Sequence, residues 1–296
     1  MVHWRCTSLS RGDYGNRQRS LRQRAEGDAS GLGVVFNLGS APSVTSMTSA
    51  PITAQALSDA VSPFFGDLGS KYMLDPATAE IGKAAGYSDG FSFYMAGRGG
   101  VLGDVDADVV YSAFMFFDKA IVRKMWERGV AVEGARKAGT RYAGAADAWG
   151  KAHLSGFANA KRFNELAEKV IHSLDVGGLS LFAGLRAEPL PSDPVSRTYR
   201  LVTYLRELRG CIHINAVVAE GLSGIEAVLA SENGTFFAKI HGYQEPYPDV
   251  SHLAARRAKA EHVTSERMAD VYERALTASE RGEFAALVAE LKAAVV

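Results

Sequence analysis

The sequence predicts an all-α fold, mainly a helical bundle with at most a minor β element. Apolar residues recur at spacings of three and four along most of the chain after Met47, which is the period of an amphipathic helix. Residues 195–220 form the longest such segment and are apolar on most sides, so we expect them to be a central helix. Residues 235–240 are the segment for which a strand is the alternative.

The first 46 residues differ in composition from the rest of the chain. They are rich in Arg, Ser and Gly and show no helical or strand period. We interpret residues 1–46 as a disordered leader or an over-extended start, with a basic nucleic-acid arm or a targeting peptide as the alternative. Residues 47–296 are then expected to form a single helical domain, with a subdivision near residues 188–194 as the alternative.

Composition and charge exclude several classes of protein. No window reaches the roughly 18 to 20 consecutive apolar residues of a membrane-spanning helix. Cys6 and Cys211 are too few for a disulfide framework or a cysteine metal cluster. Residues 1–46 hold six of the 33 basic and three of the 33 acidic residues, which leaves the remainder with a formal charge of minus three. We therefore expect a cytoplasmic protein with no membrane partner, for which nucleic acid is a disfavoured partner.

The first helices are predicted from their caps and breaks. Thr53 is the expected N-cap of a helix whose apolar positions begin at Ala54. Asp75 and Pro76 start a second helix, with Pro at its first position, and Gly86 ends it. The aromatic residues that follow within positions 91–95 indicate a segment that is buried on most sides.

The middle of the chain is predicted to contain three helical segments. Residues 106–117 form the first, with acidic residues at the positive end of its dipole. Residues 130–150 are rich in Ala and Gly and form the second, which has a weak pattern. Residues 161–174 carry one apolar stripe, and the glycines at 177–178 end that helix.

The last third of the chain surrounds the central helix with turns and shorter helices. Three of the nine prolines lie within residues 188–194, which predicts a linker or sharp turn before the central helix. Gly221 ends that helix, and a short helix follows it. Residues 242–249 (GYQEPYPD) are predicted to be a loop, and amphipathic helices over 252–276 and 279–294 complete the fold.

Two stretches of the chain resemble a known family. They are FSFYMAGRGGVLGDVDADVVYSAFMFF at residues 91–117 and TYLRELRGCIHINAVVAEGLSGIEA at residues 203–227. Both are similar to segments of an actinobacterial family that carries a helix-turn-helix label and is also called SalK-like or EvbL-like. With the EPYPD loop, the likeness spans most of residues 54–295. It implies the helical fold and, through the label alone, a DNA-binding regulator; it implies no established reaction.

The second stretch matches the helix motif of that family in part. The matching residues are Arg206, Glu207, Arg209, Gly210 and His213. The chain departs from the family motif at three positions of this helix, where Leu208 replaces a His, Cys211 replaces an Asp and Ile212 replaces a second Gly. In the first stretch, Val101 stands where the family has Pro. The lost His and Asp argue against any chemistry of the family that depends on them.

Arg206, Arg209 and His213 recur at spacings of three and four, so they share one face of the central helix. Buried cations need acceptors. In a structural network the acceptors are internal, and the candidates are Glu207, Asp104, Asp118 and Glu80. In a ligand site, the two guanidinium groups hold a carboxylate or phosphate, and His213 is a donor or base.

Arg98 is the second candidate for a site residue. It ends an aromatic segment and is followed by Gly99 and Gly100, where a backbone or a ligand can approach closely. The aromatic residues that could line a pocket beside it are Tyr72, Tyr94, Phe114 and Phe117. The alternative is that these aromatics are simply core. We predict that Arg98 and the cluster on the central helix form one site.

Other kinds of site lack support in the sequence. The glycines at 97–103 do not follow a βα turn, which argues against a dinucleotide or phosphate loop, and the histidines lack the spacing of metal ligands. The sequence therefore assigns no metal, no cofactor and no oligomeric state.

We predict a protein that binds a small anionic or partly aromatic ligand in an internal pocket. The predicted ligand-binding residues are Arg98, Tyr94, Phe114, Phe117, Arg206, Glu207, Arg209 and His213. The alternatives are a DNA-binding regulator of the helix-turn-helix type and an enzyme that uses His213 as an acid or base.

Overall fold

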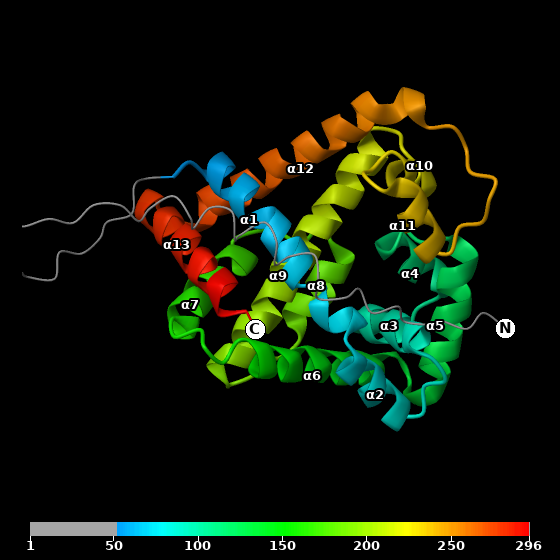
Figure 1. The fold of residues 1–296 in the computed structure, drawn as a ribbon, viewed down its shortest axis with the longest axis horizontal. Coiled ribbons are helices and arrows are strands. Elements are labelled where there is room, and N and C mark those ends of the chain that lie inside the picture. The colour runs from blue at the N-terminus through cyan, green and yellow to red at the C-terminus, as the bar shows by residue number, and fades with distance from the viewer. Residues whose placement is uncertain (1–51, 296) are drawn as a thin grey trace, which may run out of the picture. The chain divides into compact units, whose positions relative to one another are not determined.

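The computed structural model describes residues 52–295, and all regular structure in that range is helical (Figure 1). This confirms the all-α prediction. The expected leader, residues 1–46, lies outside the described residues. The helices are α1 (Ala54–Leu68), α2 (Pro76–Ala84), α3 (Gly90–Gly99), α4 (Ala107–Ala113), α5 (Lys119–Glu133), α6 (Ala135–His153), α7 (Ala160–His172), α8 (Ser180–Ala187), α9 (Pro194–Ala219), α10 (Gly224–Leu229), α11 (Gly234–Ile240), α12 (Ala254–Ala275) and α13 (Ala278–Ala294). Short 3₁₀ turns lie at Lys71–Leu74, Gly100–Leu102 and Ser251–Leu253.

The longest helix, α9, lies at the centre of the fold, as predicted. It begins at Pro194, where the Asp193 side chain accepts a hydrogen bond from the Ser196 backbone N–H. It ends shortly before Gly221, whose φ is +69°. Helices α1, α6, α7, α8 and α12 pack against it, and Figure 1 shows it running between α6 and α12. A helix surrounded in this way buries side chains on most of its faces.

The predicted starts of the first two helices are confirmed by their caps. The Thr53 side chain accepts a hydrogen bond from the Ala56 N–H at the start of α1, and Asp75 accepts one from the Ala77 N–H at the start of α2. Gly86, the predicted stop, has a φ of +99°. The two caps satisfy backbone groups that a helix end leaves unpaired.

The helix predicted over residues 106–117 is shorter than expected. It ends at Ala113 as α4, and residues 114–118 form a turn. Asp118 then caps α5 by accepting hydrogen bonds from two backbone N–H groups of its first turn. Residues 119–129 of α5 were not predicted to be helical. An Asp side chain favours a helix start over a helix interior. Phe114, Phe116 and Phe117 therefore lie in a turn between two helices.

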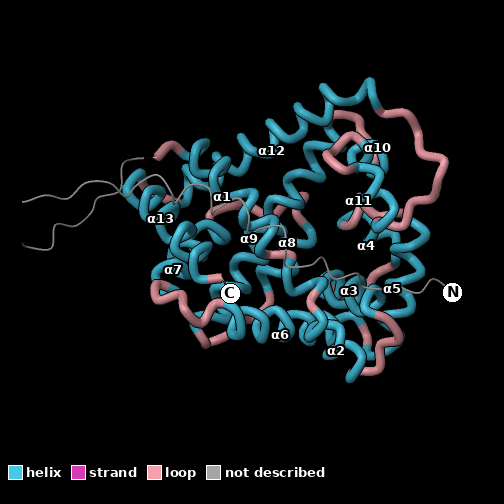
Figure 2. The backbone as a smooth tube through the Cα atoms, viewed as in Figure 1, coloured by secondary structure: helices cyan, strands magenta, loops and turns pink. Residues whose placement is uncertain are grey.

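Two further segments differ from the prediction. Residues 130–150 belong to two helices, because Gly134, with a φ of +84°, separates α5 from α6. Residues 235–240, the candidate strand, lie in helix α11, where the Phe237 N–H donates to the Asn233 carbonyl. Figure 2 shows helices and loops alone over the described residues. A short apolar run cannot be assigned to strand or helix from its pattern alone.

Most buried apolar side chains of the described residues belong to one main hydrophobic core. Phe163 of α7 and Phe284 of α13 stack within it, with ring centres 5.3 Å apart, although residues 188–194 lie between them in the sequence. A smaller apolar cluster includes Met115 from the α4–α5 turn and Val217 near the end of α9. The single-domain interpretation of residues 47–296 stays a prediction. None of the helices within residues 52–295 combines the length and the apolar character that a membrane span needs.

Candidate functional site

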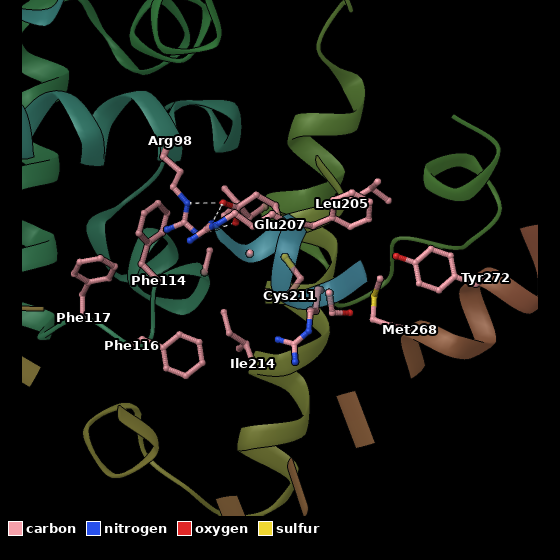
Figure 3. A pocket seen from close by; sticks show the side chains of 18 residues that line it. Arg98, Phe114, Phe116, Phe117, Leu205, Glu207, Cys211, Ile214, Met268 and Tyr272 are labelled. Atoms are coloured by element: carbon pink, nitrogen blue, oxygen red, sulfur yellow. Dashed lines mark hydrogen bonds and ion pairs between the residues drawn. The ribbon is translucent and has the colours of Figure 1, made fainter. Parts of the chain in front are cut away.

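A cavity of about 220 Å³ lies beside the central helix. Its walls come from α1, from Arg98 near the end of α3, from the α4–α5 turn, from α8, from α9 and from α12. Figure 3 shows Arg98, Phe114 and Phe117 on one side of it and Met268 and Tyr272 on the opposite side. The cavity is therefore built from segments that are far apart in the sequence.

Arg98 and Glu207 form a two-point ion pair at the wall of this cavity (Figure 3). Arg98 Nε donates to Glu207 Oε1 over 2.9 Å, and Arg98 Nη2 donates to Glu207 Oε2 over 2.6 Å. Arg98 Nη1 donates to the Tyr94 hydroxyl over 3.0 Å, and the guanidinium carbon lies 4.3 Å from the ring centre of Phe114. A carboxylate, a hydroxyl and an aromatic face together fix the orientation of this guanidinium.

Arg206 brings a second cation to the same carboxylate. Its Nη1 donates to Glu207 Oε1 over 2.5 Å. The Glu207 side chain is 3% exposed, whereas that of Arg206 is 27% exposed. Burial alone would raise the pKa of Glu207, but the positive charges of Arg98 and Arg206 outweigh it and hold this pKa below its ordinary value. Glu207 is therefore anionic, and the three side chains carry one excess positive charge.

A second charged group borders the cavity through Arg209. Arg209 Nη2 donates to Glu261 Oε2 over 2.7 Å, and Arg257 Nη1 lies 2.7 Å from Glu261 Oε1. His213 Nε2 lies 3.7 Å from the same carboxylate. Burial lowers the pKa of His213 to about 4 although Glu261 opposes the shift. Because the imidazole is neutral at pH 7, this group also carries one excess positive charge.

His213 lies next to the cavity without lining it. Its Nδ1 is 2.8 Å from the Thr264 hydroxyl, which itself donates to the Ala260 carbonyl over 2.6 Å. The Thr264 hydroxyl donates its only hydrogen to the Ala260 carbonyl, so it can only accept a hydrogen bond from His213. The neutral imidazole therefore carries its hydrogen on Nδ1 and donates to Thr264. The ring of Phe116, which does line the cavity, stacks on the imidazole with ring centres 5.7 Å apart.

The rest of the lining is largely apolar. Its main side chains are Phe114, Phe116, Phe117, Leu205, Ile214 and Met268. Burial raises the pKa of the Cys211 thiol to about 11, so this lining residue is uncharged at neutral pH. The cavity thus joins a cationic wall to an apolar interior.

Six of the eight predicted site residues line this cavity. They are Arg98, Phe114, Phe117, Arg206, Glu207 and Arg209. Of the other two, Tyr94 holds the Arg98 guanidinium through its hydroxyl, and His213 packs behind Phe116. The structure therefore brings Arg98 and the cluster on α9 to one cavity.

The partners of these arginines were only partly predicted. Glu207 is one, but Asp118 caps α5 and Glu80 pairs with Lys83 instead. Glu261 on α12 was not predicted as a partner of these arginines. Its spacing of four residues from Arg257 on a helix is the sequence feature that indicates an ion pair there.

Tyr72, which was expected beside Arg98, lines a separate cavity of about 20 Å³ that has Arg98 and Glu207 among its walls. Within residues 52–295, no three His, Cys, Asp or Glu side chains are grouped closely enough to hold a metal ion.

Comparison with known proteins gives a match to one family. The model of a family described as a helix-turn-helix family matches residues 56–247, more than half of the chain. No curated protein and no solved structure matches the chain. The matched region contains the α3 and α9 residues of the cavity, and it ends before α12, which supplies Glu261, Met268 and Tyr272.

Proposed function

The chain belongs to this helix-turn-helix family, and from that premise we propose that it binds a small organic anion in the cavity beside α9. The narrower SalK-like or EvbL-like resemblance and a cytoplasmic location are part of the same proposal. The family description gives no ligand, so the support for the proposal comes from the cavity itself.

The observation that carries the proposal is the excess of positive charge around the cavity. The cations are Arg98, Arg206, Arg209 and Arg257, and the carboxylates that they share are Glu207 and Glu261. Arginine stays protonated in proteins. The side chains of Arg206 and Arg209 are 27% and 29% exposed, so a ligand can reach the positive charge that the two carboxylates leave uncompensated. An anionic ligand would supply the missing negative charge.

Arg206 is the cation best placed to hold the acidic group of the ligand. A guanidinium has five N–H donors, and the described residues provide an acceptor for one of those on Arg206. Arg98, in contrast, engages all three of its nitrogens with Glu207 and Tyr94. Because a carboxylate accepts two parallel hydrogen bonds from such a fork, we assign the ligand contact to Arg206.

The apolar interior favours an organic anion over an inorganic one. Phe116, Leu205 and Ile214 line the cavity and offer no charged group to a ligand. Each Å² of ligand surface that they remove from water contributes about 25 cal/mol. A bare phosphate gains nothing from this part of the wall, whereas the body of an organic acid does.

A DNA-binding regulator is the second candidate, because the family is described by a helix-turn-helix. A recognition helix must present basic side chains to DNA. The exposed face of α5 carries four basic residues, but Asp108 pairs with Lys119 and Arg123, and Asp89 pairs with Arg128. This pairing and the formal charge of minus three over residues 47–296 make DNA binding the less favoured function.

Catalysis by His213 has the weakest support. A general base must reach the bound substrate. His213 does not line the cavity, and its Nδ1 is engaged with Thr264.

Thermal denaturation of the full-length protein with added ligands tests the proposed function. We expect benzoate to raise the melting temperature, because a ligand of the folded state stabilises it by mass action. Benzamide, a neutral molecule of similar shape, and inorganic phosphate should leave it unchanged. In parallel, fluorescence anisotropy with duplex DNA should show only weak association that weakens further with salt. Nanomolar, sequence-selective DNA binding without any carboxylate effect would replace the proposal with the regulator.

A further inference from the structure

Two glycines inside helices line the cavity: Gly66 in α1 and Gly210 in α9. Glycine in a helix interior is less stable than alanine, and close packing against the bare backbone is one reason for its use there. Some other helical glycines of this fold are held by close packing. A Cβ on Gly97 or on Gly150 would lie 2.5 Å from a tyrosine side chain.

Gly66 and Gly210 have no such reason. A Cβ on Gly66 would meet no atom within 4 Å, and one on Gly210 would meet only Glu207 Oε2, at 3.8 Å. Because both residues border the cavity, the space that a side chain would fill at each is open. We infer that these glycines preserve the volume of the cavity at the expense of helix stability.

We propose that the ligand is a carboxylate on a single six-membered ring, of the size of benzoate, and that Gly66 and Gly210 keep open the space for the ring. This inference rests on the proposed function and names its class of ligand. An apolar cavity of about 150 Å³ holds benzene in another protein. The cavity here measures about 220 Å³, which leaves room for a carboxylate beside the ring.

The position of Gly210 agrees with this arrangement. It follows Arg206 by four residues, so the two are neighbours on one face of α9. It also lies next to Glu207, within the cationic wall. A ring placed against the bare backbone of Gly210 would have its carboxylate within reach of the Arg206 guanidinium.

Tyr272 also belongs to the lining of this cavity. Its side chain is fully buried, and its hydroxyl has no hydrogen-bond partner among the described residues. Figure 3 shows the hydroxyl oxygen of Tyr272 on the side of its ring that faces the other lining residues. A buried hydroxyl without a partner is destabilising.

Isothermal titration of the full-length protein with benzoate, hexanoate and acetate tests the inference. We expect benzoate to bind at least about tenfold more tightly than the other two, which corresponds to about 1.4 kcal/mol. Gly210→Ala should weaken benzoate binding about tenfold, and Gly210→Leu should abolish it. The control is Gly144→Ala on the exposed face of α6, where a Cβ meets no atom within 4 Å. This change also removes a helical glycine, and it should leave the affinity unaltered.

The possible outcomes separate the ligand class from the function. Hexanoate binding as tight as that of benzoate overturns the assignment of a ring and leaves organic-anion binding standing. An unchanged benzoate affinity in folded Gly210→Ala overturns the role of the glycine, even where Gly210→Leu does not fold. If none of the three carboxylates binds, the proposed function fails together with the inference.

Discussion

Arg98 and Glu207 are 109 residues apart in the sequence, yet their side chains meet in a two-point ion pair that joins α3 to α9. Arg206 contacts the same carboxylate, so one buried anion serves two cations. The pair is thus both a structural link between two helices and one wall of the cavity.

Removing the shared carboxylate should destabilise the fold strongly. Glu207→Gln leaves the largely buried Arg98 without a counter-charge, and we expect a loss of roughly 3 to 5 kcal/mol in the free energy of unfolding. Chemical denaturation measures this loss. The control is Asp108→Asn, which breaks exposed ion pairs to Lys119 and Arg123 and should cost less than about 1 kcal/mol. Equal losses in the two variants would contradict a structural role for the buried pair.

Removing one of the two cations should have a different effect for each arginine. In Arg206→Met, the balanced pair of Arg98 and Glu207 remains, so the free energy of unfolding should stay the same or rise slightly. In Arg98→Met, Glu207 loses its two-point partner, and a loss of several kcal/mol is expected. Denaturation curves recorded under identical conditions compare the two. A larger loss in Arg206→Met than in Arg98→Met would show that Arg206 is the structural partner.

Stability should fall as the pH decreases from about 6.5 to 4. Burial lowers the pKa of His213 and of His241 to about 4, whereas an unfolded histidine has a pKa near 6.5. In this window the unfolded chain binds more protons than the folded one, so acidification favours unfolding. Each histidine contributes up to about 3 kcal/mol. Urea denaturation at several pH values measures how the free energy of unfolding changes with pH. This change should be smaller in His213→Gln than in wild type, and the same as in wild type for the control His172→Gln at an exposed site.

Two buried tyrosines should respond differently to loss of the hydroxyl. In Tyr199→Phe, the Leu68 carbonyl loses a donor and the Tyr72 N–H loses an acceptor, so we expect a cost of about 1 to 3 kcal/mol. In Tyr272→Phe, no hydrogen bond from the described residues is lost, so the ligand-free protein should be as stable as wild type or more stable. A large loss in Tyr272→Phe would mean that its hydroxyl has a structural partner in the free protein.

The central helix and several of its site residues could be predicted because their signals are local. The prolines of residues 188–194 precede α9, Gly221 follows its end, and the continuous apolar character between them indicates burial. Arg206 and Arg209 stood out because cations on so apolar a helix need partners.

The cavity itself could not be predicted, because it depends on how distant segments meet. Glu261 reaches Arg209 only through the packing of α12 on α9. Phe116 of the α4–α5 turn lines the cavity because α4 stops at Ala113. The apolar residues continue through position 117, so the sequence pattern did not show this boundary. Patterns within one helix give its buried face, whereas the partner across that face is set by the tertiary fold.

The benzoate affinity of Arg206→Met, measured by isothermal titration against wild type, tests the central claim most directly. The claim is that an unbalanced arginine in the cavity wall holds the acidic group of an organic ligand. It predicts that the variant folds with wild-type stability and binds benzoate at least about tenfold more weakly, because it lacks a charge-assisted hydrogen bond. Wild-type benzoate affinity in the folded Arg206→Met variant would contradict the claim.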